Sequence, residues 1–401
     1  MKTVEVNRPG APAEEAVIKE ARRRQRRRQF AIGAGVVLAL AGGLGTVAAL
    51  RGTSHPRPPS AHHSTSSHKQ LPAKMTGLPM PAGTNLQFLL ATVNKRTGKG
   101  ETAWYSTASR RTEPIAGLPP DSGGLLDSRV EGGWSAGGWL INLGSADPPV
   151  QGYFIADGSL TATRIGAGFQ VQASDRAGAV WLVSYPRSTD NIATTSAHVQ
   201  LVSTTGQPLG PRYRLPAGYL LSRGVGNYLL LYSVGSGSPH ELWDPRTRQV
   251  VRRIDNLIAA GPNQIAWSPI CRNCYAQVLN LSTGKSMTIP ISGQLSGIFS
   301  DDGRLLAVQL PNGGALGVFD TETGALTVIP GTALRNDIAM SFWWQDGGHR
   351  LVVMAAPGDG GNNRSSDATQ VAYWQPGDIR LRVATIQIPG GMSAVKSDWQ
   401  Y

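Results

Sequence analysis

The pattern of apolar and polar positions repeats along the C-terminal three quarters of the chain. Gly261–Ile291 aligns without a gap on Asp301–Gly331 when it is shifted by 40 positions. Tyr228–Val250 joins the same register when it is shifted by 36. A fixed period of this size indicates one supersecondary unit, which cannot bury its apolar faces alone and stacks on copies of itself.

Each unit is expected to contain four short strands. Within one repeat the predicted strands are Ser296–Ser300, Arg304–Leu310, Ala315–Asp320 and Ala325–Ile329. Gly, Asn, Asp and Pro separate them at positions that need a positive or fixed φ, and β-branched residues fill the runs between. The alternation of period two is soft, as expected for sheets that are packed on both faces.

The residue that opens the third turn of each unit can be used to count the repeats. These residues are Ser106, Ala156, Ser203, Asp244, Asn280, Asp320 and Gln375, at spacings of 50, 47, 41, 36, 40 and 55. Seven units at these spacings predict an all-β, seven-bladed β-propeller. Bulky residues come just before several of the markers, and we expect them to fill the space between blades: Tyr105, Ile155, Trp243, Phe319 and Trp374.

The two ends of the repeat region indicate how the ring closes. The first unit starts with Asn85–Val93, which resembles a second strand and has no innermost strand before it. Ser393–Asp398 resembles the first strands, because it also ends in Ser-Asp. We therefore expect the C-terminal segment to supply the missing strand of the first blade, which removes free sheet edges.

The turn-and-strand signature resembles that of the TolB-like, YVTN-type and WD-repeat propeller superfamily. It is clearest in Asp301-Asp302-Gly303-Arg304-Leu305 and Phe319-Asp320-Thr321-Glu322-Thr323-Gly324. The resemblance covers about Gly83–Tyr401 and concerns the fold alone. No functional residue is carried over, because one fold of this kind hosts many unrelated activities.

The net charge of +12 lies mainly before the repeats. Met1–Gln29 holds nine Lys and Arg against four Glu, and Arg51–Ala82 holds four cations and no acid. The propeller region carries 25 cations against 22 acids. Because the excess belongs to the tail and linker, no nucleic-acid partner is expected.

A single uncharged run near the N-terminus predicts a membrane span. Phe30–Leu50 has 21 residues, enough to cross a bilayer as a helix. The arginines of Arg22–Arg28 predict a cytoplasmic N-terminus and a propeller outside the cell membrane. An uncleaved signal anchor is favoured. The alternative is a signal that is cut near Thr46-Val47-Ala48, in which Arg27-Arg28-Gln29-Phe30 resembles a twin-arginine export signal.

A Pro/Ser/His-rich stretch follows this run and is expected to form a disordered linker. Its histidines are more typical of solvated filler than of a metal site: His55, His62, His63 and His68. The expected organisation is a tail (1–29), a transmembrane helix (30–50), a linker (51–82) and a propeller (83–401). No cofactor and no metal are expected.

Cys271 and Cys274 are the two cysteines of the chain. They align with Pro311–Gly314, a turn between second and third strands, where residues three apart come close enough for a disulfide. A zinc site would need more ligands than the globular part offers. A thiol-exchange site would need a strand-to-helix setting. Outside the cell we therefore expect a disulfide that pins the hairpin.

Signatures of catalysis are scarce. The sequence has no His-Glu-x-x-His helix and no phosphate loop, and no catalytic residue is assigned. The predicted innermost strands are nearly free of acids, and Asp127 and Glu131 near the second blade are the exception. An exported hydrolase or lactonase with a site at the central channel therefore stays as the alternative function.

The favoured function is that of a binding or scaffold module for a protein, peptide or envelope glycan. The turns between second and third strands emerge on one face of a propeller and vary most in length here, and long polar loops on a rigid scaffold are where recognition usually occurs. The alternative is that these are tolerated surface insertions. The candidate binding residues are Lys95, Arg96, Arg187, Asp190, Asn191, His240, Asn362, Asn363 and Arg364.

Overall fold

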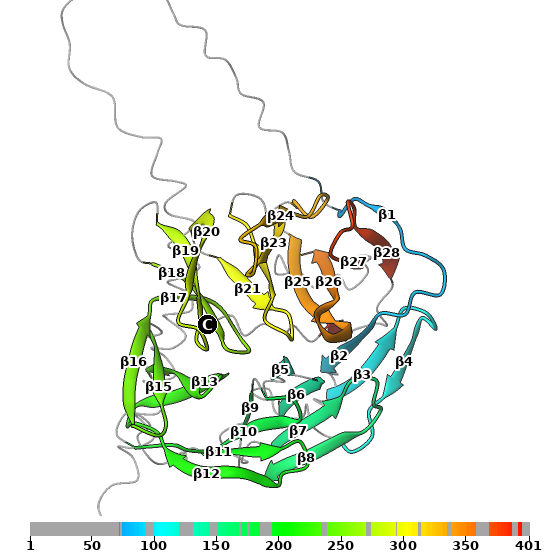
Figure 1. The fold of residues 1–401 in the computed structure, drawn as a ribbon. Helices are drawn as coiled ribbons and strands as arrows, with labels where there is room; N and C mark the ends of the chain where they lie inside the picture. Colours follow the sequence, from blue (N-terminus) through cyan, green and yellow to red (C-terminus); the bar gives the residue numbers. More distant parts are fainter. Residues whose placement is uncertain are drawn as a thin grey trace, which may run out of the picture. The chain divides into compact units, whose positions relative to one another are not determined.

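The structure is a computed structural model, and it describes residues 72, 74–93, 100–119, 131–135, 137–143, 151–167, 170–174, 176–184, 195–233, 239–269, 274–293, 295–311, 314–334, 338–357, 369–386 and 392–394. These residues belong to the unit His68–Tyr401 and form seven sheets (Figure 1). We call the sheets blades and number them along the chain. Each blade is a four-stranded antiparallel sheet, and blade 7 has one strand more.

The strands of the first four blades follow one another from the inner to the outer edge. Blade 1 contains β29 (Met392–Ala394), β2 (Gln87–Val93), β3 (Gly100–Ser106) and β4 (Arg111–Pro114). Blade 2 contains β5 (Glu131–Ser135), β6 (Gly138–Leu143), β7 (Gln151–Ala156) and β8 (Ala162–Ala167). Blade 3 contains β9 (Gln170–Ala173), β10 (Ala179–Ser184), β11 (His198–Ser203) and β12 (Pro208–Arg214). Blade 4 contains β13 (Tyr219–Val225), β14 (Tyr228–Ser233), β15 (His240–Asp244) and β16 (Gln249–Ile254).

The last three blades have the same order. Blade 5 contains β17 (Asn256–Gly261), β18 (Gln264–Ser268), β19 (Tyr275–Asn280) and β20 (Ser286–Ser292). Blade 6 contains β21 (Ser296–Phe299), β22 (Leu305–Gln309), β23 (Leu316–Asp320) and β24 (Leu326–Val328). Blade 7 contains β25 (Ile338–Gln345), β26 (Arg350–Pro357), β27 (Thr369–Trp374), β28 (Arg382–Ile386) and, outside β28, β1 (Leu78–Pro79). A 3-10 turn, η1 (Asp346–Gly348), joins β25 to β26.

The seven marker residues lie where the repeat predicts them. Six are the last residues of β3, β7, β11, β15, β19 and β23, and Gln375 directly follows β27. The turn after Asp320 shows why this position favours Asp or Asn. Its carboxylate accepts the backbone N–H of Glu322 at 2.8 Å and of Thr323 at 3.0 Å. Such a side chain replaces backbone partners in a tight turn.

Apolar clusters join every pair of neighbouring blades, so the seven blades form a closed propeller. One cluster lies between blades 7, 1 and 2, and five others join blades 2 to 3, 3 to 4, 4 to 5, 5 to 6 and 6 to 7. The bulky residues before the markers are buried in these clusters, as expected: Tyr105, Ile155, Trp243, Phe319 and Trp374.

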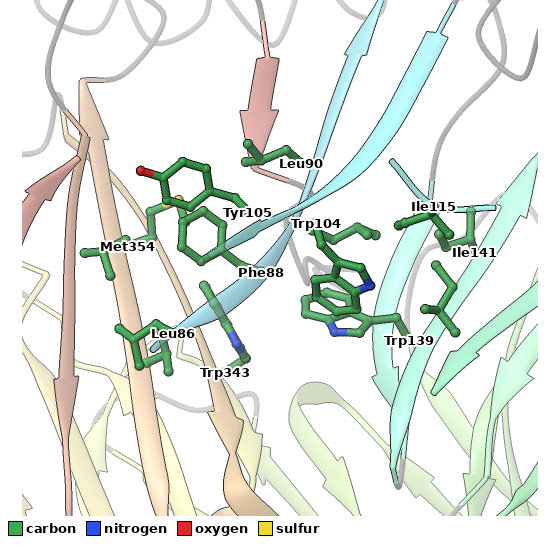
Figure 2. Packing of buried hydrophobic residues seen from close by; sticks show 14 of the residues in the cluster. Leu86, Phe88, Leu90, Trp104, Tyr105, Ile115, Trp139, Ile141, Trp343 and Met354 are labelled. Atoms are coloured by element: carbon green, nitrogen blue, oxygen red, sulfur yellow. The ribbon is translucent and has the colours of Figure 1, made fainter. Parts of the chain in front are cut away.

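Aromatic rings fill the junction of blades 7, 1 and 2. The ring centroids of Trp343 and Trp139 are 6.3 Å apart, and those of Trp104 and Trp139 are 6.0 Å apart. Figure 2 shows these indoles beside Phe88 and Tyr105. The Trp104 indole N–H also donates to the Ser159 carbonyl at 2.6 Å and so joins blade 1 to blade 2 by a hydrogen bond. Edge-to-face contacts of this kind add to the stabilisation from burial.

The C-terminal segment closes the first blade, as the sequence predicts. β29 pairs antiparallel with β2, and Ala394 lies opposite Leu90 while Met392 lies opposite Thr92. The first blade therefore combines strands from both ends of the domain.

The segment before β2 differs from the sequence expectation. The expected linker runs to Ala82, but β1 lies parallel to β28, and Met75 is buried at 4 % exposure. The Gln370 side chain accepts the Met75 N–H at 2.6 Å and donates to the Met75 carbonyl at 3.4 Å. The Thr76 N–H donates to Gly331, where an added Cβ would collide with the Thr76 carbonyl oxygen. The buried Met75, the partly buried Met80 and an open sheet edge thus order a segment whose average composition indicates a linker.

Two further expectations concern residues that the structure does not describe. Phe30–Leu50 lies outside the described residues, among which no helix is long and apolar enough to cross a membrane. The two cysteines belong to the connection between β18 and β19, as their alignment predicts. Cys271 lies outside the described residues, so the pairing with Cys274 stays a prediction.

Candidate functional site

The predicted loop-face residues follow second strands or precede third strands. Eight of them lie outside the described residues: Lys95, Arg96, Arg187, Asp190, Asn191, Asn362, Asn363 and Arg364. The strands that carry these loops are described, and they are β2 and β3, β10 and β11, and β26 and β27. The described strand ends that border the three connections are equivalent in the three blades.

His240, the ninth candidate, is not a surface residue. It is the first residue of β15 and is only 3 % exposed, with its ring centroid 6.0 Å from that of Tyr232. It pairs with Ile254 in the ladder of blade 4. The polar run of residues 235–239 suggests a loop that extends through His240, but the third strand begins at this residue. His240 therefore contributes to packing and does not offer a surface to a partner.

Burial lowers the pKa of His240 from 6.5 to about 4. In the unfolded chain the His240 imidazole binds a proton below pH 6.5, whereas in the folded state it binds one only below about pH 4. The imidazole therefore destabilises the fold as the pH falls. Linkage gives about 3 kcal/mol of lost stability at pH 4. We expect His240→Gln to lose less stability than the unchanged protein between pH 7.5 and pH 4, measured by urea unfolding. Equal losses in both proteins would contradict this expectation.

Asp301 and Asp302 are adjacent carboxylates in the turn between β21 and β22. The Asp302 carboxylate accepts the Ser300 hydroxyl at 2.6 Å and the Arg304 N–H at 2.9 Å. Arg304 in turn contacts Asp320 at 3.1 Å and Glu322 at 3.3 Å. These acids are therefore engaged in holding two neighbouring turns together.

Asp157 is a partly buried acid whose pKa is affected by a second acid, Asp346. Burial, and then the charge of Asp346, raises the pKa of Asp157. Asp346 itself contacts Arg350 at 3.2 Å. Across the described part of the chain, no three His, Cys, Asp or Glu residues lie together as a metal site would need. Asp127 and the side chain of Glu131 lie outside the described residues.

Blade 2 contains a serine motif with the spacing of a catalytic nucleophile. Gly133-Trp134-Ser135-Ala136-Gly137 has the Gly-x-Ser-x-Gly spacing of a nucleophile elbow. In such an elbow the serine lies on a sharp turn from a strand into a helix. Here β5 pairs antiparallel with β6, and Ser135 lies opposite Gly138 in that ladder. The motif therefore forms a hairpin between two strands, and we assign it no catalytic role.

Sequence reasoning missed a basic surface on the outer side of blade 4. Arg246, Arg248, Arg252 and Arg253 are all exposed. The Arg252 guanidinium lies 4.7 Å from the centre of the Trp267 ring, and Arg253 contacts Glu241 at 3.3 Å. The net charge of the whole propeller region hides this surface. The run of arginines between Asp244 and Asp255 is the signal that could have revealed it.

The adjacent outer strand of blade 3 carries two more exposed arginines, Arg212 and Arg214. Burial, and then the charges of these two residues, lowers the pKa of His198. The outer strands of blades 3 and 4 therefore present positive charge to the solvent.

Comparison with known proteins gives structural matches only. No protein-family model and no curated protein matches the chain. A prolyl endopeptidase structure is 10 % identical with a TM-score of 0.50, and the match covers 80 % of this chain and 50 % of that one. An acylaminoacyl peptidase of Pyrococcus horikoshii is also 10 % identical with a TM-score of 0.50, over 77 % and 52 % of the two chains. TolB of Acinetobacter baumannii is 14 % identical with a TM-score of 0.38, over 76 % and 81 %.

These matches define the fold and not the activity. The chain spans about half the length of the peptidases it matches, and its identity to them is 10 %. The resemblance that the turn signature suggests is confirmed at the level of the fold. The chain is an all-β, seven-bladed propeller.

Proposed function

We propose that the chain is a membrane-anchored propeller outside the cell, and that it binds a protein, peptide or envelope glycan through the loops between second and third strands. The observation that carries this proposal is the pairing of a rigid closed ring with unequal connections on one face. Residues 185–197 connect β10 to β11, and residues 358–368 connect β26 to β27, whereas residues 310–315 suffice in blade 6. A rigid scaffold with variable loops is typical of recognition proteins.

The described acids support a binding role more than a catalytic one. Asp302, Asp320 and Glu322 are engaged with Arg304 or with backbone groups of the turns. A catalytic carboxylate needs a geometry that leaves it facing a substrate. The proposed anchor rests on the sequence, in which an arginine block precedes an uncharged run of 21 residues.

Capture from envelope extracts tests the binding face. The full chain, purified in detergent, serves as bait beside two variants. In one variant Arg187, Asp190 and Asn191 are changed to alanine, and in the other Asn362, Asn363 and Arg364 are. We expect at least one variant to lose the captured partner while its melting temperature stays unchanged. A control, Arg110→Ala on the turn between β3 and β4, should capture normally. Equal capture by all four proteins would refute the proposed face.

Protease treatment of intact cells tests the orientation. We expect external protease to digest the propeller and to leave a tag on the N-terminus protected. A tag that is digested with the propeller, or a propeller that survives until the cells are lysed, would contradict the proposed anchoring.

A further inference from the structure

The outer edges of the blades differ in whether a proline or another segment blocks the addition of a further strand. An open outer strand exposes unpaired backbone groups to which another strand can add, and proteins blunt such edges with proline, short strands or a cover. Four outer strands have a proline within them or two residues after their end. These prolines are Pro114 in β4, Pro208 and Pro211 in β12, Pro290 in β20, and Pro330 after the three-residue β24.

Two other outer strands are covered by the chain itself. β28 carries β1 as an added parallel strand. The start of β8 is bridged by Ala116, which accepts the Ala162 N–H at 2.8 Å and donates to the Leu160 carbonyl at 2.8 Å. Of the seven described outer strands, β16 alone has neither a proline nor a cover. It does carry a β-bulge, because Val251 lies between the pairs Trp243–Val250 and Leu242–Arg252.

β16 also exposes apolar side chains. Val250 is 44 % exposed and Val251 is 54 % exposed, which makes β16 the one described strand with two large apolar residues open to solvent. Single exposed apolar residues are ordinary on a protein surface, but two on an edge without proline or cover offer a partner both apolar contacts and backbone partners.

The charges around β16 restrict what can bind there. Arg246, Arg248, Arg252 and Arg253 are exposed, whereas two of the nearby acids, Glu241 and Asp244, are engaged. The Glu241 side chain, 7 % exposed, contacts Arg253. The Asp244 side chain accepts the Arg246 N–H at 2.8 Å. A second copy of β16 would bring arginines against arginines, and like charges across a strand pair are destabilising. An acidic strand would instead be attracted.

The fold itself contains an example of this kind of addition. β1 adds to the outer edge of blade 7, and the Leu78 N–H donates to the Leu381 carbonyl at 2.8 Å while the Met80 N–H donates to the Val383 carbonyl at 3.0 Å. A blade edge of this propeller can therefore hold a short extended segment through backbone hydrogen bonds. β16 offers an equivalent edge with no segment of the described chain on it.

We propose that β16 is a docking edge that accepts an extended acidic segment of a partner protein as an added strand. Strand addition supplies affinity through backbone hydrogen bonds, and the side chains supply specificity. A lipid surface or a polyanionic glycan could neutralise the arginines but would leave the backbone edge unpaired. A peptide that carries both acidic and β-branched residues matches the arginines and the two valines. This edge is distinct from the loop face of the proposed function.

Selection from a displayed library of random 12-residue peptides tests the proposal. The purified full chain is the target, and we expect the enriched peptides to be acidic, rich in β-branched residues and free of proline. The best peptide is then measured by fluorescence anisotropy against three proteins. We expect binding to weaken at least about tenfold with Arg246→Glu/Arg248→Glu, since close charge pairs contribute on this scale. Arg110→Glu/Arg111→Glu is the matched control on blade 1, because Arg110 and Arg248 share a positive φ of 53° and 60°.

A backbone-modified probe separates strand addition from simple charge attraction. Two forms of the same peptide carry N-methyl groups on alternate residues, one on the odd and one on the even positions. Both keep their charges, and each lacks the backbone N–H donors along one edge. We expect the form that lacks the donors facing β16 to lose binding. Equal binding of both N-methylated forms, or equal weakening by the blade 1 control, would overturn the proposal. So would an enriched set without acidic residues, or vesicles of anionic phospholipid that displace the peptide. Loop-face variants should bind the peptide normally, which keeps this test independent of the proposed function.

Discussion

Deletion of Met392–Tyr401 is expected to abolish folding of the propeller. The deletion removes β29, which pairs with β2 along Leu90–Thr92, and so opens the inner edge of blade 1. It also opens the one blade that joins the two ends of the ring. The free energy of unfolding of a domain is only about 5–15 kcal/mol. We expect the loss of the β29–β2 pairing and of ring closure together to cost more than this. Expression yield in the soluble fraction and the melting transition measure the effect.

A second truncation provides the control for this deletion. Removal of residues 395–401 keeps β29 and should preserve a cooperative melting transition, because the described ladder ends at Ala394. If the longer deletion melts like the full chain, β29 does not close the ring in the way that the ladder indicates.

Substitution of Trp343 by alanine is expected to cost about 3–5 kcal/mol of unfolding free energy, the range for large aromatic truncations in a core. The residue is 2 % exposed and lies in the cluster that joins blades 7, 1 and 2, with its ring 6.2 Å from that of Phe88. Loss of the Trp343 ring leaves a cavity bordered by three blades, and all three would have to move to fill it. Urea unfolding at neutral pH measures the change.

The neighbouring tryptophan offers a matched comparison. The Trp344 indole N–H donates to the Ile298 carbonyl at 3.1 Å, whereas the Trp343 indole N–H has no partner in the described part of the chain. Trp343→Phe removes an unsatisfied buried donor, and Trp344→Phe removes a hydrogen bond between blades 7 and 6. We therefore expect Trp344→Phe to cost about 1 kcal/mol more than Trp343→Phe. The opposite order would contradict this account of the two indole N–H groups.

The sequence predicts the blades well because turns and strands are local. Asp320 and Asn280 organise their turns through their own backbone neighbours, and Gly324 and Gly284 adopt the positive φ that each turn needs. A gapless repeat then transfers each assignment to the next blade. Ring closure is also visible, because a missing first strand at one end implies a spare strand at the other.

The features that the sequence does not predict depend on contacts between distant segments. Met75 follows a Pro/Ser/His-rich stretch, and it is ordered on blade 7 by contacts with distant residues, among them Gln370, 295 positions away. The sequence predicts His240 in a loop, whereas in the structure it pairs with Ile254 in the ladder of blade 4. The exposure of Val251 beside Arg253 likewise requires knowledge of which strand is outermost, which the repeat alone does not give.

The position of β1 has a mechanical consequence. Traction on the residues that precede Met75 meets the side chain of Gln370 and the β1–β28 hydrogen bonds before it reaches β2. β1 pairs with β28 through two residues and β29 pairs with β2 through three, so under load we expect β1 to detach before the closing pair opens.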